Sequence, residues 1–209
     1  MSRLGGTRGD DRRGSALLVT MLTAVLVSGL AGGLVIVLST EQAVEANHRR
    51  GVTAFYAADG LLAGVTTELM EVADWRPVFS GSRLSSFGSG PLSVRLADGA
   101  AVDLPEMTLQ LQRETDAAGG PGPGPLWRLF AWGWFADLLG DTSSGRLLYV
   151  AAWISDGGAD QDPDQTTEAT QRIVVRATAF GPFRARRSVE ASLGRTANDA
   201  HVVTWDLVY

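Results

Sequence analysis

The longest apolar stretch of the chain covers residues 15–38, where 24 consecutive positions carry no charge. At a rise of about 1.5 Å per residue, a helix of this length crosses a bilayer core of about 30 Å. Residues 40–74 follow without a proline and place apolar side chains at alternating steps of three and four. These side chains are Phe55, Ala58, Leu62, Val65, Leu69 and Val72. We therefore expect one helix of roughly 60 residues, membrane-spanning in its first half and amphipathic in its second.

Beyond this helix the hydrophobic pattern changes to alternation with period two, which is typical of strands. The helix should end near Asp74, because Pro77 disfavours a helical Arg76. Asp98-Gly99 is the turn of a predicted hairpin, since glycine readily adopts the positive φ that such turns need. The predicted strands are residues 92–96, 101–104, 107–112, 147–154, 172–179 and 186–193, and a closing strand with Val203, Trp205 and Leu207 on one face. The sequence thus predicts an α+β fold in which the helix packs on an antiparallel sheet.

Two segments between these elements have unusual composition. Residues 80–90 are rich in Ser and Gly and predict a loop, as do the glycines and prolines of residues 118–125. Residues 126–139 hold much of the aromatic content of the chain. One interpretation is a strand or short helix buried against the long helix, and the other is an exposed aromatic patch for subunit contact or adhesion.

Residues 1–13 lack hydrophobic periodicity, are rich in Gly and Arg, and are typical of a targeting segment. Arg12 and Arg13 lie directly before the apolar stretch, so the positive-inside rule keeps the N-terminus cytoplasmic and sends the remainder outward. A secretory signal cleaved within the stretch, near the small residues 29–33, is the alternative. Such signals usually have a shorter apolar region of about 7 to 15 residues.

Three features of the N-terminal region name a family. Gly14 precedes the apolar stretch, residues 40–47 read TEQAVEAN, and residues 54–61 read AFYAADGL. This combination resembles the N-terminal region of type IV minor pilins, closest to the PilX-type group. A weaker likeness, to the C-terminal strand pair of the same group, lies in residues 172–191. The resemblance implies the pilin architecture, prepilin peptidase cleavage between Gly14 and Ser15, and N-methylation of Ser15.

The same resemblance implies a role in assembly. Val19 stands at the fifth mature position, where most pilins carry a glutamate, which suggests either a subunit at the filament tip or simple divergence. Gly29, Gly32 and Gly33 could pack against a neighbouring helix or allow local melting when the helix leaves lipid. Phe55 and Leu62 of the amphipathic stripe complete the predicted assembly residues. The implied partners are other pilins and minor pilins, the prepilin peptidase and the inner membrane.

Acidic residues suggest the only candidate for metal chemistry. Asp156, Asp160, Asp162 and Asp164 lie in a Gly-containing segment and could supply oxygen ligands to Ca²⁺. The alternative is a solvated acidic loop. No other cofactor is expected, and there is no cysteine for a thiolate site.

Charge and histidine content bear on other functions. Without the leader, which carries +2, the net charge of −5 becomes −7, and this argues against nucleic acid as a partner. His48 and His201 are isolated in the sequence, so we do not expect an enzyme.

The sequence thus predicts a leader (residues 1–14), a transmembrane half-helix (15–38), an amphipathic half-helix (39–75) and a β-rich globular domain (76–209). The predicted function is that of a minor pilin that primes or caps a type IV pilus. Alternatives are a type II secretion pseudopilin and a single-pass anchored surface domain that binds through its aromatic segment. The expected location is the bacterial inner membrane, N-terminus inside and domain in the periplasm, and then the pilus or its tip.

Overall fold

The computed structural model describes residues 10–88, 90–118, 125–140, 146–157, 171–196 and 199–208, with side chains from residue 15 onward. The predicted long helix is present as α1, Asp10–Glu71, a helix of 62 residues. The chain divides into two compact units, Met1–His48 and Arg49–Tyr209. Helix α1 therefore contributes its first part to one unit and its second part to the other.

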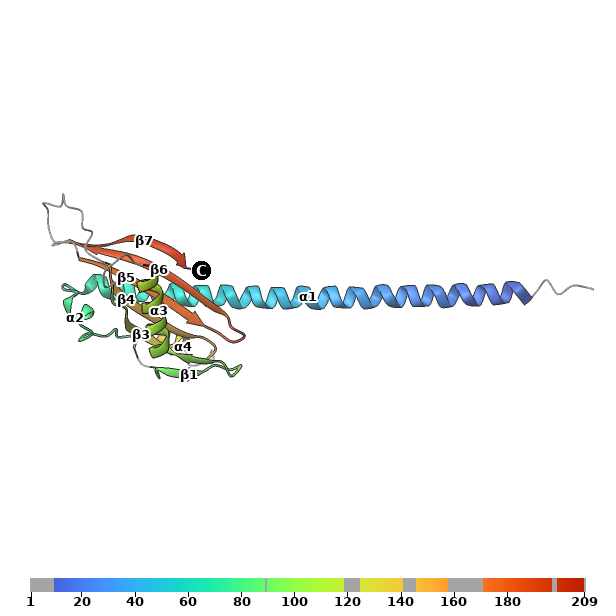
Figure 1. Cartoon of the computed structure of the whole chain (residues 1–209), viewed down its shortest axis with the longest axis horizontal. Coiled ribbons are helices and arrows are strands. Elements are labelled where there is room, and N and C mark those ends of the chain that lie inside the picture. Colours follow the sequence, from blue (N-terminus) through green and yellow to red (C-terminus); the bar gives the residue numbers. More distant parts are fainter. Residues whose placement is uncertain are drawn as a thin grey trace, which may run out of the picture. The chain divides into compact units, whose positions relative to one another are not determined.

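The unit Arg49–Tyr209 is built around one antiparallel sheet. Its strands are β3 (Arg128–Trp134), β4 (Tyr149–Asp156), β5 (Gln171–Phe180), β6 (Arg186–Arg195) and β7 (Ala200–Val208). They lie in sequence order, so each strand pairs with its neighbour in the chain (Figure 1). The smaller elements are α2 (Arg76–Phe79), β1 (Ser93–Arg95), β2 (Ala101–Asp103), α3 (Leu104–Ala118) and α4 (Phe135–Leu138), with β1 and β2 forming a separate hairpin.

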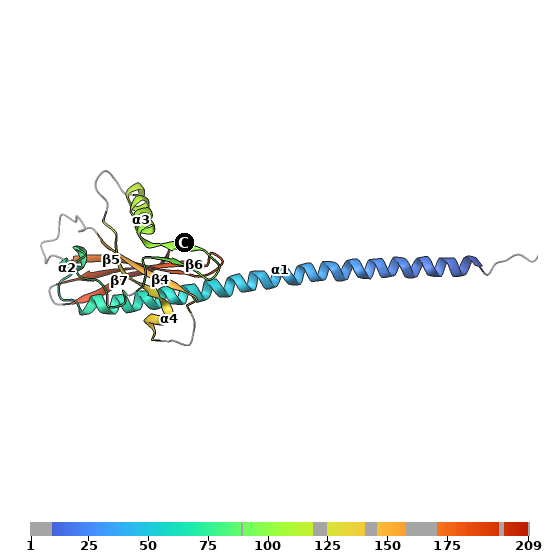
Figure 2. The same ribbon diagram turned by 90° about the horizontal axis from the view of Figure 1, so that it is seen from below.

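The two faces of the sheet are covered by different helices. The carboxyl-terminal part of α1 lies along one face, and α3 lies on the other (Figure 2). On the α1 side, Leu62, Val65 and Leu69 are fully buried against residues of β4, β5 and β6. Phe55, the first residue of the predicted stripe, is partly buried at the margin of this core. The predicted packing of an amphipathic helix on an antiparallel sheet is confirmed.

The strand predicted for residues 107–112 is wrong, because this segment lies within α3. Met107, Leu109 and Leu111 alternate, but Leu104, Met107 and Leu111 also fit the spacing of one helical face. The structure buries Leu104 and Leu111, leaves Leu109 58% exposed, and sets Met107 beside the core. A short alternating run is compatible with both periods, and the contact with the sheet favours the helix.

The remaining predicted strands are confirmed with small shifts in their ends. Gly99 has a φ of +85° in the turn between β1 and β2. β5 and β6 pair across the turn that begins at Gly181 and Pro182, and β7 closes the described sheet. β4 is an interior strand in which all residues except Asp156 are buried.

The aromatic segment, residues 126–139, follows the buried interpretation. It forms β3 and α4, with Phe130 in the core beneath α1 and Trp127 in the core beneath α3. Trp127 donates from Nε1 to the Thr115 hydroxyl at 2.7 Å, so its polar atom is satisfied inside that core. Phe135 and Trp134 are partly buried. This segment is therefore mainly core, and the aromatic patch predicted as an alternative is not formed by it.

Candidate functional site

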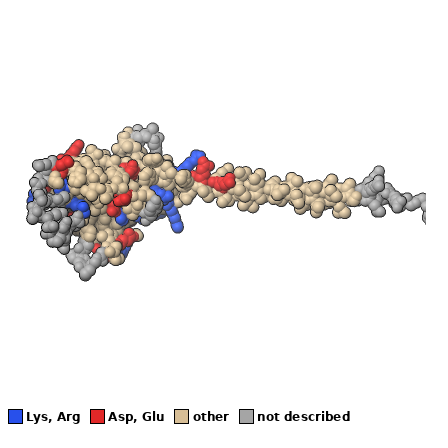
Figure 3. Space-filling model, turned by 90° about the horizontal axis from the view of Figure 1, so that it is seen from above, with Lys and Arg blue, Asp and Glu red and all other residues tan. Residues whose placement is uncertain are grey.

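The apolar segment of residues 15–38 lies in the unit Met1–His48, and all of its residues are exposed. Its large hydrophobic residues are between 47% and 71% exposed, and Val19 is 60% exposed. The segment shows no acidic or basic side chain in the space-filling view (Figure 3). This is the one helix of the described chain that is long and apolar enough to span a membrane.

Two threonine side chains of this segment are satisfied within the helix. The Thr20 hydroxyl donates to the Leu17 carbonyl at 2.9 Å, and the Thr23 hydroxyl donates to the carbonyls of Val19 and Thr20 at 2.9 Å. A hydroxyl that is bonded to the backbone costs little free energy when it enters an apolar environment. These two hydroxyls are thus compatible with lipid or with a packed helix bundle.

The predicted assembly glycines lie on an open part of the same helix. At Gly29, Gly32 and Gly33, an added Cβ atom would meet nothing within 4 Å. The lack of side chains at these positions is therefore not explained by packing within the described chain. A neighbouring helix could approach closely there, as small residues allow in membrane helices.

The predicted processing residues lie near the start of α1. Gly14 is in the helix, which begins at Asp10, and Ser15 follows in the same helix. A peptidase that cut the bond between them would have to unwind this turn. Gly14 lowers the cost, since glycine in a helix is about 1 kcal/mol less stable than alanine.

The end of α1 is fixed to the sheet by two side chains, which also explains why the helix ends before Asp74. Trp75 is fully buried and donates from Nε1 to the Leu69 carbonyl at 2.8 Å. Arg195 of β6 donates from Nη2 to the Met70 carbonyl at 3.0 Å and lies 5.0 Å from the Trp75 ring centroid. A cation at the carboxyl end of a helix is favourable because the last carbonyls carry partial negative charge.

The rotation of α1 on the sheet is set by polar contacts on its flanks. Glu68 accepts from the Ser85 hydroxyl at 2.5 Å and from the Ser86 amide at 3.0 Å. Asp59 accepts from Trp205 Nε1 of β7 at 3.2 Å. Asp59 stands where the pilin pattern has a glutamate, and in this chain its carboxylate contacts the edge strand of the same unit.

One end of the unit Arg49–Tyr209 carries a strained, exposed aromatic turn. Phe183 and Arg184 lie between β5 and β6 with φ values of 59° and 60°. The Asp98 carboxylate accepts hydrogen bonds from the amides of Phe183 and Ala100, and these bonds lower the pKa of Asp98. The guanidinium of Arg50 lies 4.3 Å from the centroid of the Phe183 ring. The Phe183 side chain is 63% exposed. We call this feature the Phe183 turn.

An apolar hollow of about 500 Å³ lies beside the Phe183 turn. Pro182 and Ala185 of the turn, Leu139 and Leu147 contribute to its walls, with Arg49 and Arg50 of α1 also lining it. Leu139 is 66% exposed and Leu147 is 61% exposed. This end of the unit thus combines cations with accessible apolar surface.

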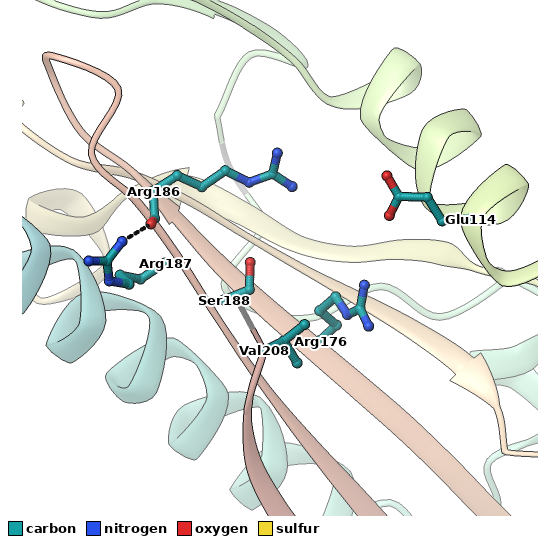
Figure 4. Close-up of a pocket in the computed structure, with 6 residues that line it drawn as sticks. All are labelled: Glu114, Arg176, Arg186, Arg187, Ser188 and Val208. Carbon is teal, nitrogen blue, oxygen red and sulfur yellow. Dashed lines mark hydrogen bonds between the residues drawn. The ribbon is translucent and has the colours of Figure 1, made fainter. Parts of the chain in front are cut away.

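A second hollow, of about 430 Å³, is lined mainly by charged residues, among them Glu114 of α3. Arg176 and Arg186 extend toward Glu114 of α3, whereas Arg187 extends the other way, toward α1 (Figure 4). Arg176 already forms an ion pair with Glu190 at 2.8 Å and lies 5.4 Å from the Trp127 ring centroid. Arg176 is thus held by side chains beside and within the sheet.

Of the four predicted metal ligands, only Asp156 lies within the described residues. Asp156 lies exposed at the end of β4, while Asp160, Asp162 and Asp164 lie outside the described residues. Within the described ranges, no group of three or more His, Cys, Asp or Glu side chains could hold a metal ion. His48 lies on α1 and His201 on β7, and both are exposed.

Sequence reasoning missed the end of the unit that carries the Phe183 turn. The arginines gathered there are Arg49 and Arg50 of α1, Arg184 of the β5–β6 turn and Arg187 of β6. Over 130 residues separate the two groups, so no local pattern links them. The sequence does contain two pairs of adjacent arginines, Arg49-Arg50 and Arg186-Arg187, which could have drawn attention to this end.

No protein-family model, curated protein or solved structure matches this chain. The class of protein is therefore defined by its own features. It is an α+β protein with an apolar N-terminal helix long enough to cross a membrane, and the same helix continues into the core of a globular unit.

Proposed function

We propose that the chain is a pilin-like structural subunit, of the PilX-like minor pilin kind, that is stored in the inner membrane and then assembled into a type IV pilus. The observation that carries the proposal is the unequal covering of α1. Residues 54–72 supply the core of the globular unit, whereas residues 15–38 expose a continuous apolar surface. Large exposed apolar surfaces mark sites that lipid or protein partners cover.

Assembly then exchanges one apolar environment for another. The helix leaves lipid and packs beside helices of neighbouring subunits, so residues 15–38 stay out of water throughout. Val19 adds no charge to this surface, and the open glycines permit close helix contact. We propose that the subunit primes or caps the filament, because Val19 cannot form the contact that a glutamate makes at that position in other pilins.

A type II secretion pseudopilin would use the same helix in the same way, and it remains the alternative within this class. The alternative from another class, an anchored domain that binds through residues 126–139, loses its proposed surface because those aromatic residues are mainly in the core. A surface-binding role would have to use another part of the unit.

The proposal is tested by identifying the N-terminus of the protein after expression in a host that has a prepilin peptidase. Mass spectrometry should find a mature chain that starts at N-methylated Ser15. The substitution Gly14→Glu should leave the leader attached, because a large charged side chain does not fit a site that accepts glycine. The matched control, Gly29→Ala, should be processed normally. A mature chain that starts within or after residues 29–33, or one that keeps Met1 in the presence of the peptidase, would contradict the proposal.

A further inference from the structure

We propose that the end of the globular unit that carries the Phe183 turn is a docking surface for a membrane that contains anionic phospholipid. The surface consists of the arginines at positions 49, 50, 184 and 187, the Phe183 ring, and the apolar hollow beside them. The inference rests on the membrane anchoring in the proposed function and goes beyond it. It assigns to the globular unit a second contact with the bilayer before assembly.

Arginines gather at this end of an otherwise acidic protein. The chain carries a net charge of −5, yet four of its 18 basic residues gather here. All of them are arginines, which bind phosphate oxygens through a planar fork of donors. Asp98, the acidic residue that contacts the turn, is engaged by the amides of Phe183 and Ala100.

The contacts between α1 and the turn hold these cations in one place. Arg50 covers the Phe183 ring at 4.3 Å. Arg187 lies over Gly51, where an added Cβ atom would come within 2.9 Å of its Nη2. Glycine at position 51 therefore lets the arginine of β6 approach α1 closely.

The apolar part of the surface selects lipid over a purely acidic partner. The Phe183 side chain is 63% exposed. Its backbone has a positive φ, which costs of order 1–3 kcal/mol in a non-glycine residue. Leu139 and Leu147 are accessible at the adjoining hollow. An interface that mixes arginine with exposed Phe and Leu is the pattern of proteins that bind the headgroup region of a bilayer. The acidic helix segment of another copy, with Glu41 and Glu45, would use only the charges.

The length of chain between the apolar segment and this end limits how far the end can lie from the bilayer. Eleven residues lead from Leu38, the last residue of the apolar segment, to Arg49. They span about 16 Å as a helix and at most about 40 Å if fully extended. Tethering of this kind raises the effective concentration of a surface into the millimolar range, so even weak contacts become populated. Each arginine near an anionic membrane contributes about a fivefold gain in binding, and the gain is lost at high salt.

The test uses the full chain in nanodiscs that hold one copy each, made either of phosphatidylcholine or of an equal mixture of phosphatidylcholine and phosphatidylglycerol. Hydrogen exchange of residues 181–187 is measured by mass spectrometry. We expect exchange to be about five to ten times slower in the anionic discs at low salt, and the difference to vanish at high salt.

Three variants locate the effect. Arg184→Glu should reduce the difference to about twofold or less, and Arg184→Lys should keep most of it, because Lys retains the charge. Arg83→Glu is the matched control and should change nothing. Arg83 and the Phe183 turn lie at opposite ends of β5. Arg83 follows α2, and the neighbouring Trp75 contacts Gln171 at the start of β5. The Phe183 turn follows Phe180, the last residue of β5. Unchanged thermal unfolding of each variant shows that the fold is intact.

Equal exchange in neutral and anionic discs would overturn the inference. Slowed exchange that requires two copies per disc would also overturn it, since the partner would then be another copy. Neither result affects the proposed function, which fails separately if the protein is not processed at Ser15 or is extracted from membranes by alkaline carbonate.

Discussion

The two halves of α1 are similar in composition and opposite in environment. Residues 15–38 and residues 54–71 are both rich in Ala, Leu and Val, and both belong to one helix. In the second half the apolar side chains form a stripe that the sheet covers, with polar residues on the other side. In the first half they surround the helix and stay exposed. A helix that is hydrophobic on all sides needs cover on all sides, which a single sheet cannot supply.

The largest difference between the halves should appear when a leucine is truncated. Leu62→Ala removes a fully buried side chain and should lower the free energy of unfolding by about 2–5 kcal/mol. Leu26→Ala, at a residue that is 61% exposed, should leave it unchanged. The measurement is urea unfolding of the full chain in mild detergent, followed by tryptophan fluorescence. All six tryptophans lie in Arg49–Tyr209, so the signal reports on that unit.

The reverse contrast should appear in membrane insertion. Val25→Arg places a charge in the apolar segment and should cost about 2.5–3.5 kcal/mol, which is enough to release much of the protein from membranes in alkaline carbonate. Val52→Arg makes the same change in the second half, at a residue that is 39% exposed, and should leave the protein membrane-bound. If both variants or neither are released, the two halves do not differ in the way we infer.

The contact that ends the second half should contribute less. Arg195→Met keeps the apolar length of the side chain but removes the hydrogen bond to the Met70 carbonyl and the charge at the helix terminus. We expect a loss of about 1–2 kcal/mol in the same unfolding measurement. Arg83→Met, in an exposed loop, is the control and should have no measurable effect. A loss of equal size in both variants would indicate a general effect of net charge.

The smallest expected effect concerns Tyr149 in β4, an interior strand of the sheet that covers the second half. Burial raises the pKa of Tyr149 to about 12, and its hydroxyl donates to the Pro91 carbonyl. Because the pKa is higher in the folded state, this stabilisation is complete below pH 10 and is lost as pH rises from 10 through about 12.

Tyr149→Phe should therefore flatten the decline in stability over this interval and cost about 1 kcal/mol at neutral pH. Tyr56→Phe, at a side chain that is 65% exposed, is the matched control. Unfolding curves collected across the interval test the difference. A decline that persists unchanged in Tyr149→Phe would assign the alkaline transition to other groups.

Much of this architecture follows from local sequence periods. The apolar run, the stripe with steps of three and four, the turn at Asp98-Gly99 and the β5–β6 pair were all predicted from patterns within a few residues. Such patterns are reliable when they are long, because many positions then agree on one period. The resemblance to minor pilins also comes from the sequence alone, and it remains a proposal.

The tertiary structure decided what short patterns left open. Residues 107–112 alternate like a strand, but contact with the sheet through Leu104 and Leu111 makes them part of α3. The end of α1 is set by Trp75 and by Arg195, which is 125 residues away from Met70. The Phe183 turn is completed by Arg50 and Asp98 from distant segments. Contacts between residues far apart in the chain have no period, so only the folded protein brings them together.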